Sequence, residues 1–185
     1  MASIAEHIET QEEYRFSPAQ RLIHWLMAAV IIAALGLGLY CSYLQPGTPL
    51  RQFLMDIHKS LGMTALVLLV IRLPLRLSLG EPAFRKPLGR LLSLASHAGH
   101  FALYGLMILM PFSGYTTSAA GGHDLPWFGL FHWPNVVPAS KALDHLAGAV
   151  HKLGAYAFFA VLGIHIAAAL WHHFVRKDEV LGRMM

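Results

Sequence analysis

Long apolar segments without charged residues alternate with short polar or proline-rich segments along the 185 residues of the chain. No Asp, Glu, Lys or Arg occurs between Arg21 and Arg51, and none occurs between Arg90 and Asp124. A helix of about 20 apolar residues is long enough to cross the hydrocarbon core of a bilayer. Four segments reach or approach this length, at about residues 18–43, 53–77, 91–118 and 147–174. The pattern predicts an all-α membrane protein, a single domain formed by a bundle of four transmembrane helices.

The segments outside these helices are polar, and their positive charges predict an orientation. Residues 1–17 are expected to form a short cytosolic tail, and residues 44–52, 78–90 and 119–146 are expected to be loops. An even number of spans places both termini on one side, together with the basic loop 78–90. Ten of the 14 Lys and Arg residues lie on that side. Because positive charge is enriched in cytoplasmic loops, both termini are expected in the cytoplasm.

The composition supports a membrane protein and limits the chemistry available to it. Hydrophobic residues make up 56% of the chain and charged residues only 13%, whereas about 25% is usual in soluble domains. The single cysteine, Cys41, allows no intrachain disulfide and no thiolate metal cluster. The net charge of +4 is modest, and no nucleic-acid partner is expected. The 12 histidines are an excess that calls for an explanation.

Two histidines in the last apolar segment occupy one face of the predicted helix. His151 and His165 are fourteen residues apart, which corresponds to about 21 Å along a helix. At about 100° per residue their side chains lie within about 40° of each other. One would therefore lie near each side of the membrane. Ionisable residues inside a membrane are costly, so both are candidates for a functional role with partners on other helices.

The predicted topology gives each of these histidines a partner at the same depth. His24 begins the first span on the cytoplasmic side, where His165 also lies. His58 begins the second span on the outer side, where His151 also lies. Imidazole is a common axial ligand of haem iron, and two imidazoles on one iron leave no open position. The pairs His24/His165 and His58/His151 therefore predict two b haems that transfer electrons. The alternative for any one of them is an interfacial or hydrogen-bonded histidine.

Further histidines lie near the cytoplasmic side. His97 and His100 either compete with His24 for the inner haem, hydrogen-bond a haem propionate or line a quinone pocket. His172 follows His165 by seven residues and is a candidate to hydrogen-bond a quinone or transfer a proton. The alternative for His172 is an interfacial side chain that extends to the membrane surface.

Several cations are candidates for contacts with haem propionates. On the inner side these are Arg21, Arg72 and Arg76, since Arg and carboxylate form strong paired hydrogen bonds. The alternative is ordinary anchoring by positive charge at the cytoplasmic surface. On the outer side Lys59 and Lys152 each follow a candidate ligand by one residue, and either could neutralise a propionate or attract an anion.

Five stretches of the sequence resemble the bacterial cytochrome b561 family of dihaem membrane proteins. They are RLIHW (21–25), DIHKSLG (56–62), IRLPLR (71–76), HAGHFALYGL (97–106) and the run from His151 through WHHFVRKDEVLGRMM at the C-terminus. The resemblance implies four transmembrane helices in the bacterial inner membrane. It also implies two b haems, with axial ligands at the positions of His24, His58, His151 and His165, and electron transfer with the ubiquinone pool.

Members of this family differ in the electron donor that they oxidise. Some oxidise superoxide at the outer face and reduce ubiquinone, and others serve a periplasmic partner or a hydrogenase-type module. In this sequence the attraction of superoxide depends on Arg51, Lys59 and Lys152, because Lys141 is the only cation in the loop 119–146. The expected function is quinone-reducing electron transfer, with superoxide as the candidate donor. The alternatives are a non-catalytic electron-transfer subunit and a haem-free transporter or scaffold. The protein is expected to be a monomer or a homodimer.

Overall fold

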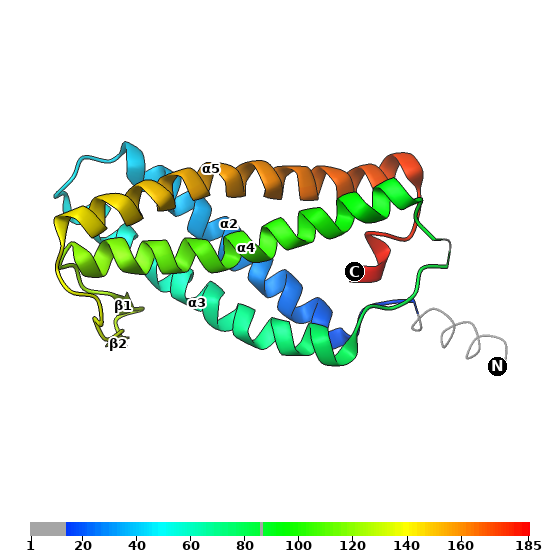
Figure 1. Cartoon of the computed structure of the whole chain (residues 1–185), viewed down its shortest axis with the longest axis horizontal. Coiled ribbons are helices and arrows are strands. Elements are labelled where there is room, and N and C mark those ends of the chain that lie inside the picture. Colours follow the sequence, from blue (N-terminus) through cyan, green and yellow to red (C-terminus); the bar gives the residue numbers. More distant parts are fainter. Residues whose placement is uncertain (1–13, 86) are drawn as a thin grey trace.

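Four long helices lie side by side in one bundle in the computed structural model, which describes residues 14–85 and 87–185 (Figure 1). The helices are α2 (Pro18–Tyr43), α3 (Pro49–Leu79), α4 (Arg90–Ala120) and α5 (Lys141–Trp171). Each is long and apolar enough to cross a membrane. The predicted all-α bundle of four membrane-spanning helices is confirmed, and the chain is a multi-pass membrane protein.

The bundle consists of two antiparallel helical hairpins. Helix α2 packs along α3, α4 packs along α5, and a smaller contact between α3 and α4 joins the hairpins. The core between them contains Met27, Leu69, Leu103 and Phe158. Many large side chains on the outside of the helices are also apolar, as expected of a surface that faces lipid.

Two helices begin earlier than the apolar segments that predict them. Helix α3 starts at Pro49 rather than 53, because the Thr48 side chain accepts the backbone N–H of Arg51 and proline is tolerated in the first turn. Helix α5 starts at Lys141 rather than 147, and Ser140 caps it in the same way. The expected loops 44–52 and 119–146 are shorter as a result. Helices α3 and α4 otherwise extend the predicted spans by one or two residues.

A small antiparallel ribbon covers one end of the bundle. It consists of β1 (Pro126–Trp127) and β2 (Phe131–His132) in the loop between α4 and α5. The buried hydroxyl of Ser60 accepts the backbone N–H of Phe128 at 3.0 Å. The indole N–H of Trp127 donates to the Thr64 hydroxyl at 3.0 Å. Both contacts bind the ribbon to α3 and so fix it over one end of the bundle.

The C-terminal segment folds back against the opposite end of the bundle (Figure 1). Helix α5 continues into a π-helical turn, η1 (His172–Arg176), and the chain ends with η2 (Gly182–Met184). Arg183 is only 3% exposed, with its guanidinium 3.6 Å from the ring centre of Phe84. Its Nε–H donates to the carbonyl of Tyr14. Burial lowers the pKa of Arg183, although the nearby carboxylates of Glu81 and Glu179 act in the opposite direction.

The contacts of Arg183 join three separate segments at this end of the bundle, namely the chain before α2, the α3–α4 connection and the C-terminal segment. Residues 1–13 of the expected polar tail lie outside the described residues.

Candidate functional site

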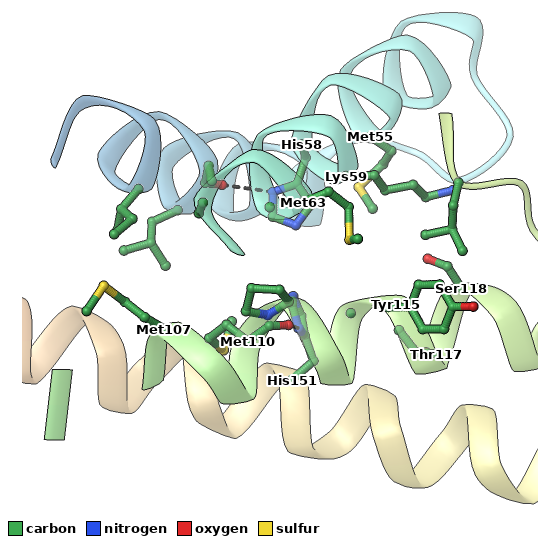
Figure 2. A pocket seen from close by; sticks show the side chains of 18 of the residues that line it. Met55, His58, Lys59, Met63, Met107, Met110, Tyr115, Thr117, Ser118 and His151 are labelled. Carbon is green, nitrogen blue, oxygen red and sulfur yellow. Dashed lines mark hydrogen bonds between the residues drawn. The ribbon is translucent and has the colours of Figure 1, made fainter. Parts of the chain in front are cut away.

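Two histidines face each other across a cavity toward the end of the bundle that carries the β1–β2 ribbon (Figure 2). His58 comes from α3 and His151 from α5, and their ring centres are 6.1 Å apart. The cavity contains about 810 Å³ of empty space, part of which opens to the surroundings. Most of its wall is apolar, with Lys59 at one end.

Hydrogen bonds to the helix backbone orient both rings. The Nδ1–H of His58 donates to the carbonyl of Ala34 on α2 at 2.8 Å (dashed line in Figure 2). The Nδ1–H of His151 donates to the carbonyl of Met110 on α4 at 3.0 Å. A carbonyl oxygen can only accept, so the proton of each neutral ring is on Nδ1. The Nε2 atom of each ring is therefore left with a free lone pair, the form in which imidazole binds a metal.

This geometry fits an iron held between the two rings. Two imidazoles that bind one metal ion from opposite sides have ring centres about 6 Å apart, because each metal–nitrogen bond is about 2 Å long and each ring centre lies about 1 Å beyond the nitrogen. The wall of the cavity includes Gly62, and no atom lies within 4 Å of the place where its Cβ would be. The apolar wall and the open space beside this helix suit a flat macrocycle.

A second histidine pair lies toward the opposite end of the bundle. The ring centres of His24 on α2 and His165 on α5 are 6.4 Å apart. His100 on α4 is also close, 5.5 Å from His165. Arg72 is a charged neighbour of His24 and His165, and its Nε–H donates to the Tyr104 hydroxyl at 3.3 Å.

No group of three His, Cys, Asp or Glu side chains suited to a bare metal ion occurs in residues 14–85 and 87–185. The spacing of His24 and His165 is that of a pair spanning one metal, whereas His100 and His165 are closer together.

The remaining candidate residues occupy different positions near this second histidine pair and the C-terminal segment. His97 is exposed and its Nδ1–H donates to the carbonyl of Ser93 in its own helix. Arg21 donates to the carbonyl of Met185, and Arg76 forms an ion pair with Glu81. Of the three candidate arginines, Arg72 is therefore the one that lies close to His24 and His165.

His172 is buried and has a carboxylate partner. Its Nδ1 lies 2.6 Å from a carboxylate oxygen of Asp178. The two residues face each other because the chain turns back after the π-helical turn, where Lys177 adopts a left-handed conformation. Single π-helical turns often occur at functional sites. The spacing of six residues in the sequence does not by itself predict this contact.

The sequence profile of the family described as prokaryotic cytochrome b561 matches residues 15–185. The chain belongs to this family. It is therefore a membrane electron-transfer protein, and its family implies b-type haem. In this cytochrome, the two histidine pairs described above have the spacing that fits a haem iron.

Curated relatives match over nearly their full length. Cytochrome b561 homolog 2 of Escherichia coli (strain K12) is 32% identical over 176 residues, which are 95% of this chain and 94% of the relative. Probable superoxide oxidase CybB of Yersinia pestis is 34% identical over 175 residues, 92% of this chain and 96% of the relative. Cytochrome b561 homolog 1 of Escherichia coli (strain K12) is 28% identical, covering 92% of this chain and 97% of the relative.

Proposed function

We propose that this cytochrome carries electrons from the outer face of the bacterial inner membrane to ubiquinone, with superoxide as the donor. The observation that carries the proposal is the presence of two facing histidine pairs, with ring centres 6.1 and 6.4 Å apart, at different depths of the bundle. The similarity to a probable superoxide oxidase supports the choice of donor.

Each pair would hold one b haem. His58 and His151 would hold the outer haem, and His24 and His165 would hold the inner haem. Iron with an imidazole on each side accepts and releases single electrons without binding a substrate. The fourteen residues from His151 to His165 correspond to about 21 Å along α5, so the two haems would lie at different depths.

The distribution of charge supports an orientation with both termini in the cytoplasm. The end that carries His172, Arg183 and the α3–α4 connection would face the cytoplasm, since most of the cations lie there. The outer pair and the β1–β2 ribbon would then face the periplasm. The donor is oxidised at the periplasmic end and quinone is reduced at the cytoplasmic end.

Lys59 is the cation best placed to attract an anion to the outer site. It lines the cavity between His58 and His151, and its side chain is 15% exposed. Its ammonium donates to the carbonyl of Asp124 at 2.8 Å and lies 3.9 Å from a carboxylate oxygen of Asp56. A positive charge at the edge of an apolar cavity raises the local concentration of anions. Lys59 would therefore guide superoxide or neutralise a haem carboxylate.

His172 and Asp178 are the best-placed groups for proton delivery at the inner end. Two superoxide ions give up one electron each and leave as two oxygen molecules, and ubiquinone takes up two electrons and two protons to become ubiquinol. The protons must come from the cytoplasmic side. A histidine hydrogen-bonded to a carboxylate can donate a proton and be reprotonated from water, and His172 is held in this way.

The purified cytochrome tests this proposal directly. We expect about two b haems per chain, reduction of the haems by superoxide, and superoxide consumption that increases when a soluble ubiquinone is added. Two haems that superoxide leaves oxidised would instead favour an electron-transfer subunit that depends on a partner. A preparation with one haem or none, expressed with haem supplied, would contradict the assignment of the two pairs.

Replacing Lys59 with Gln should slow superoxide oxidation about threefold to tenfold and weaken its dependence on ionic strength, because the charge at the edge of the cavity is removed. Stopped-flow reduction of the haems by superoxide at several salt concentrations measures both effects. Lys141→Gln at the exposed start of α5 is the matched control, and Lys59→Arg should retain the rate. Equal losses in Lys59→Gln and Lys141→Gln would contradict a specific role for Lys59.

A further inference from the structure

We propose that Gly38 and Gly114 are positioning residues for the outer haem site. Each glycine leaves the space in which the ring of one outer histidine lies against a neighbouring helix, so that the ring can bond to a backbone carbonyl. The inference rests on the proposed roles of His58 and His151 as axial ligands. We refer to each glycine, with the carbonyl four residues before it, as a glycine notch.

The first glycine notch is formed by Gly38 and the carbonyl of Ala34 on α2. A Cβ added at Gly38 would lie 2.8 Å from Cε1 and 3.2 Å from Nδ1 of His58. The first distance is shorter than any ordinary carbon–carbon contact, so a larger residue would displace the ring. The Nδ1–H···O bond from His58 to Ala34 is 2.8 Å long in the space that the glycine leaves free.

The second glycine notch is formed by Gly114 and the carbonyl of Met110 on α4. A Cβ added at Gly114 would lie 2.9 Å from Cε1 and 3.2 Å from Nδ1 of His151. The ring again donates from Nδ1, here to the Met110 carbonyl at 3.0 Å, with the Ser113 hydroxyl 3.1 Å from the same nitrogen. The arrangement is the same in both hairpins, down to the ring atoms that face the glycine.

The two glycines lie at equivalent positions relative to an earlier histidine on the same helix. His24 precedes Gly38 by fourteen residues, and His100 precedes Gly114 by fourteen. A helical carbonyl normally accepts the N–H four residues later, which in both notches is that of the glycine. The second lone pair of the carbonyl remains available for the histidine. Use of one arrangement twice, once for each ring of the outer pair, argues against an accident of packing.

The bond that each notch permits has a chemical consequence for the ligand. Donation from Nδ1 to a carbonyl keeps the proton off Nε2, orients the ring and makes the ligating nitrogen more basic. Loss of such a contact typically lowers metal affinity about 10-fold to 100-fold. Gly38 and Gly114 thus act through His58 and His151, without needing to touch the haem.

Alanine substitutions at the two notches test the inference. In Gly38→Ala and in Gly114→Ala, the haem content of the purified chain should fall from about two toward about one, and the outer haem should dissociate about 10-fold to 100-fold more readily. Any outer haem that remains should show a shifted low-spin electron paramagnetic resonance signal and a raised midpoint potential. Valine should have a larger effect than alanine at both positions. The signal of the inner haem should be unchanged, which also reports that the variant is folded.

Matched controls are available on the same two helices. Gly36 on α2 and Gly105 on α4 are exposed, and no atom lies within 4 Å of a Cβ added at either. Gly36→Ala and Gly105→Ala should keep both haems with unchanged signals.

Three results would overturn the inference. They differ in whether they also contradict the assignment of His58 and His151 as haem ligands. If His58→Ala removes the outer haem but both notch variants retain it with unchanged signal and potential, the positioning role is wrong and the ligand assignment stands. If both notch variants lose the two haems together, the role is not confined to the outer site and the inference is wrong. If His58→Ala keeps both haems, the proposed ligands are wrong and the inference fails with them.

Discussion

His165→Ala is expected to remove the inner haem and abolish quinone reduction, while superoxide still reduces the outer haem. The haem content should fall from about two per chain to about one, because a haem held on one side only is bound weakly in a site built for two axial ligands. His58→Ala should have the complementary effect, with the outer haem lost and the inner haem no longer reduced by superoxide. Haem quantification and stopped-flow spectra of both variants measure these outcomes.

The decisive part of this prediction is that each variant loses a different haem, the inner one in His165→Ala and the outer one in His58→Ala. His132→Ala, in the exposed strand β2, is the control and should keep both haems and the full rate. Retention of both haems in His58→Ala and His165→Ala would mean that the facing pairs are not the ligands. If His165→Ala kept the inner haem and His100→Ala lost it, His100 would replace His165 as the ligand, since its ring centre is only 5.5 Å from that of His165.

Replacing His172 with Gln should slow quinone reduction about 100-fold, because a positioned acid typically contributes a factor of about 100 to 10,000. Reduction of both haems by superoxide should stay at the rate of the unmodified protein, since the outer site is unchanged. Asp178→Asn should have the same type of effect with a smaller magnitude, because the histidine remains but loses its charged partner. Pre-steady-state measurements separate haem reduction from quinol formation.

The neighbouring residue provides the control for this prediction. His173 follows directly in the π-helical turn but is exposed, so His173→Gln should reduce quinone normally. An equal loss in His172→Gln and His173→Gln would indicate a general disturbance of the turn. An unchanged rate in His172→Gln would exclude His172 as the proton donor.

The number of spans and the depth of the histidines could be predicted from the sequence because both depend on distance along one chain. An apolar segment must be long enough to cross the bilayer, and residues fourteen apart on a helix share a face. The four helices are confirmed, and the structure brings together the rings that depth pairs, His58 with His151 and His24 with His165. Their roles as ligands remain predictions.

The first residues of α3 and α5 were harder to predict. The first turn of each helix is polar, so it lies outside the apolar segment that hydropathy identifies. Pro49 and Lys141 both begin helices inside segments that composition marks as loops. The local signals were present in Thr48 and Ser140, whose side chains accept the N–H of the third residue after them. Capping therefore decides the boundary where apolar length does not.

Contacts between helices were decided only by the tertiary structure. Apolar periodicity gives the depth and the face of a residue on its own helix, but the rotation of one helix against another depends on how all the core side chains pack. This rotation brings His100 and Arg72 to the inner pair, and it leaves Arg21 and Arg76 in other contacts. It also places the rings of His58 and His151 against glycines of neighbouring helices, a match of shape and hydrogen bonding that no single segment of the sequence contains.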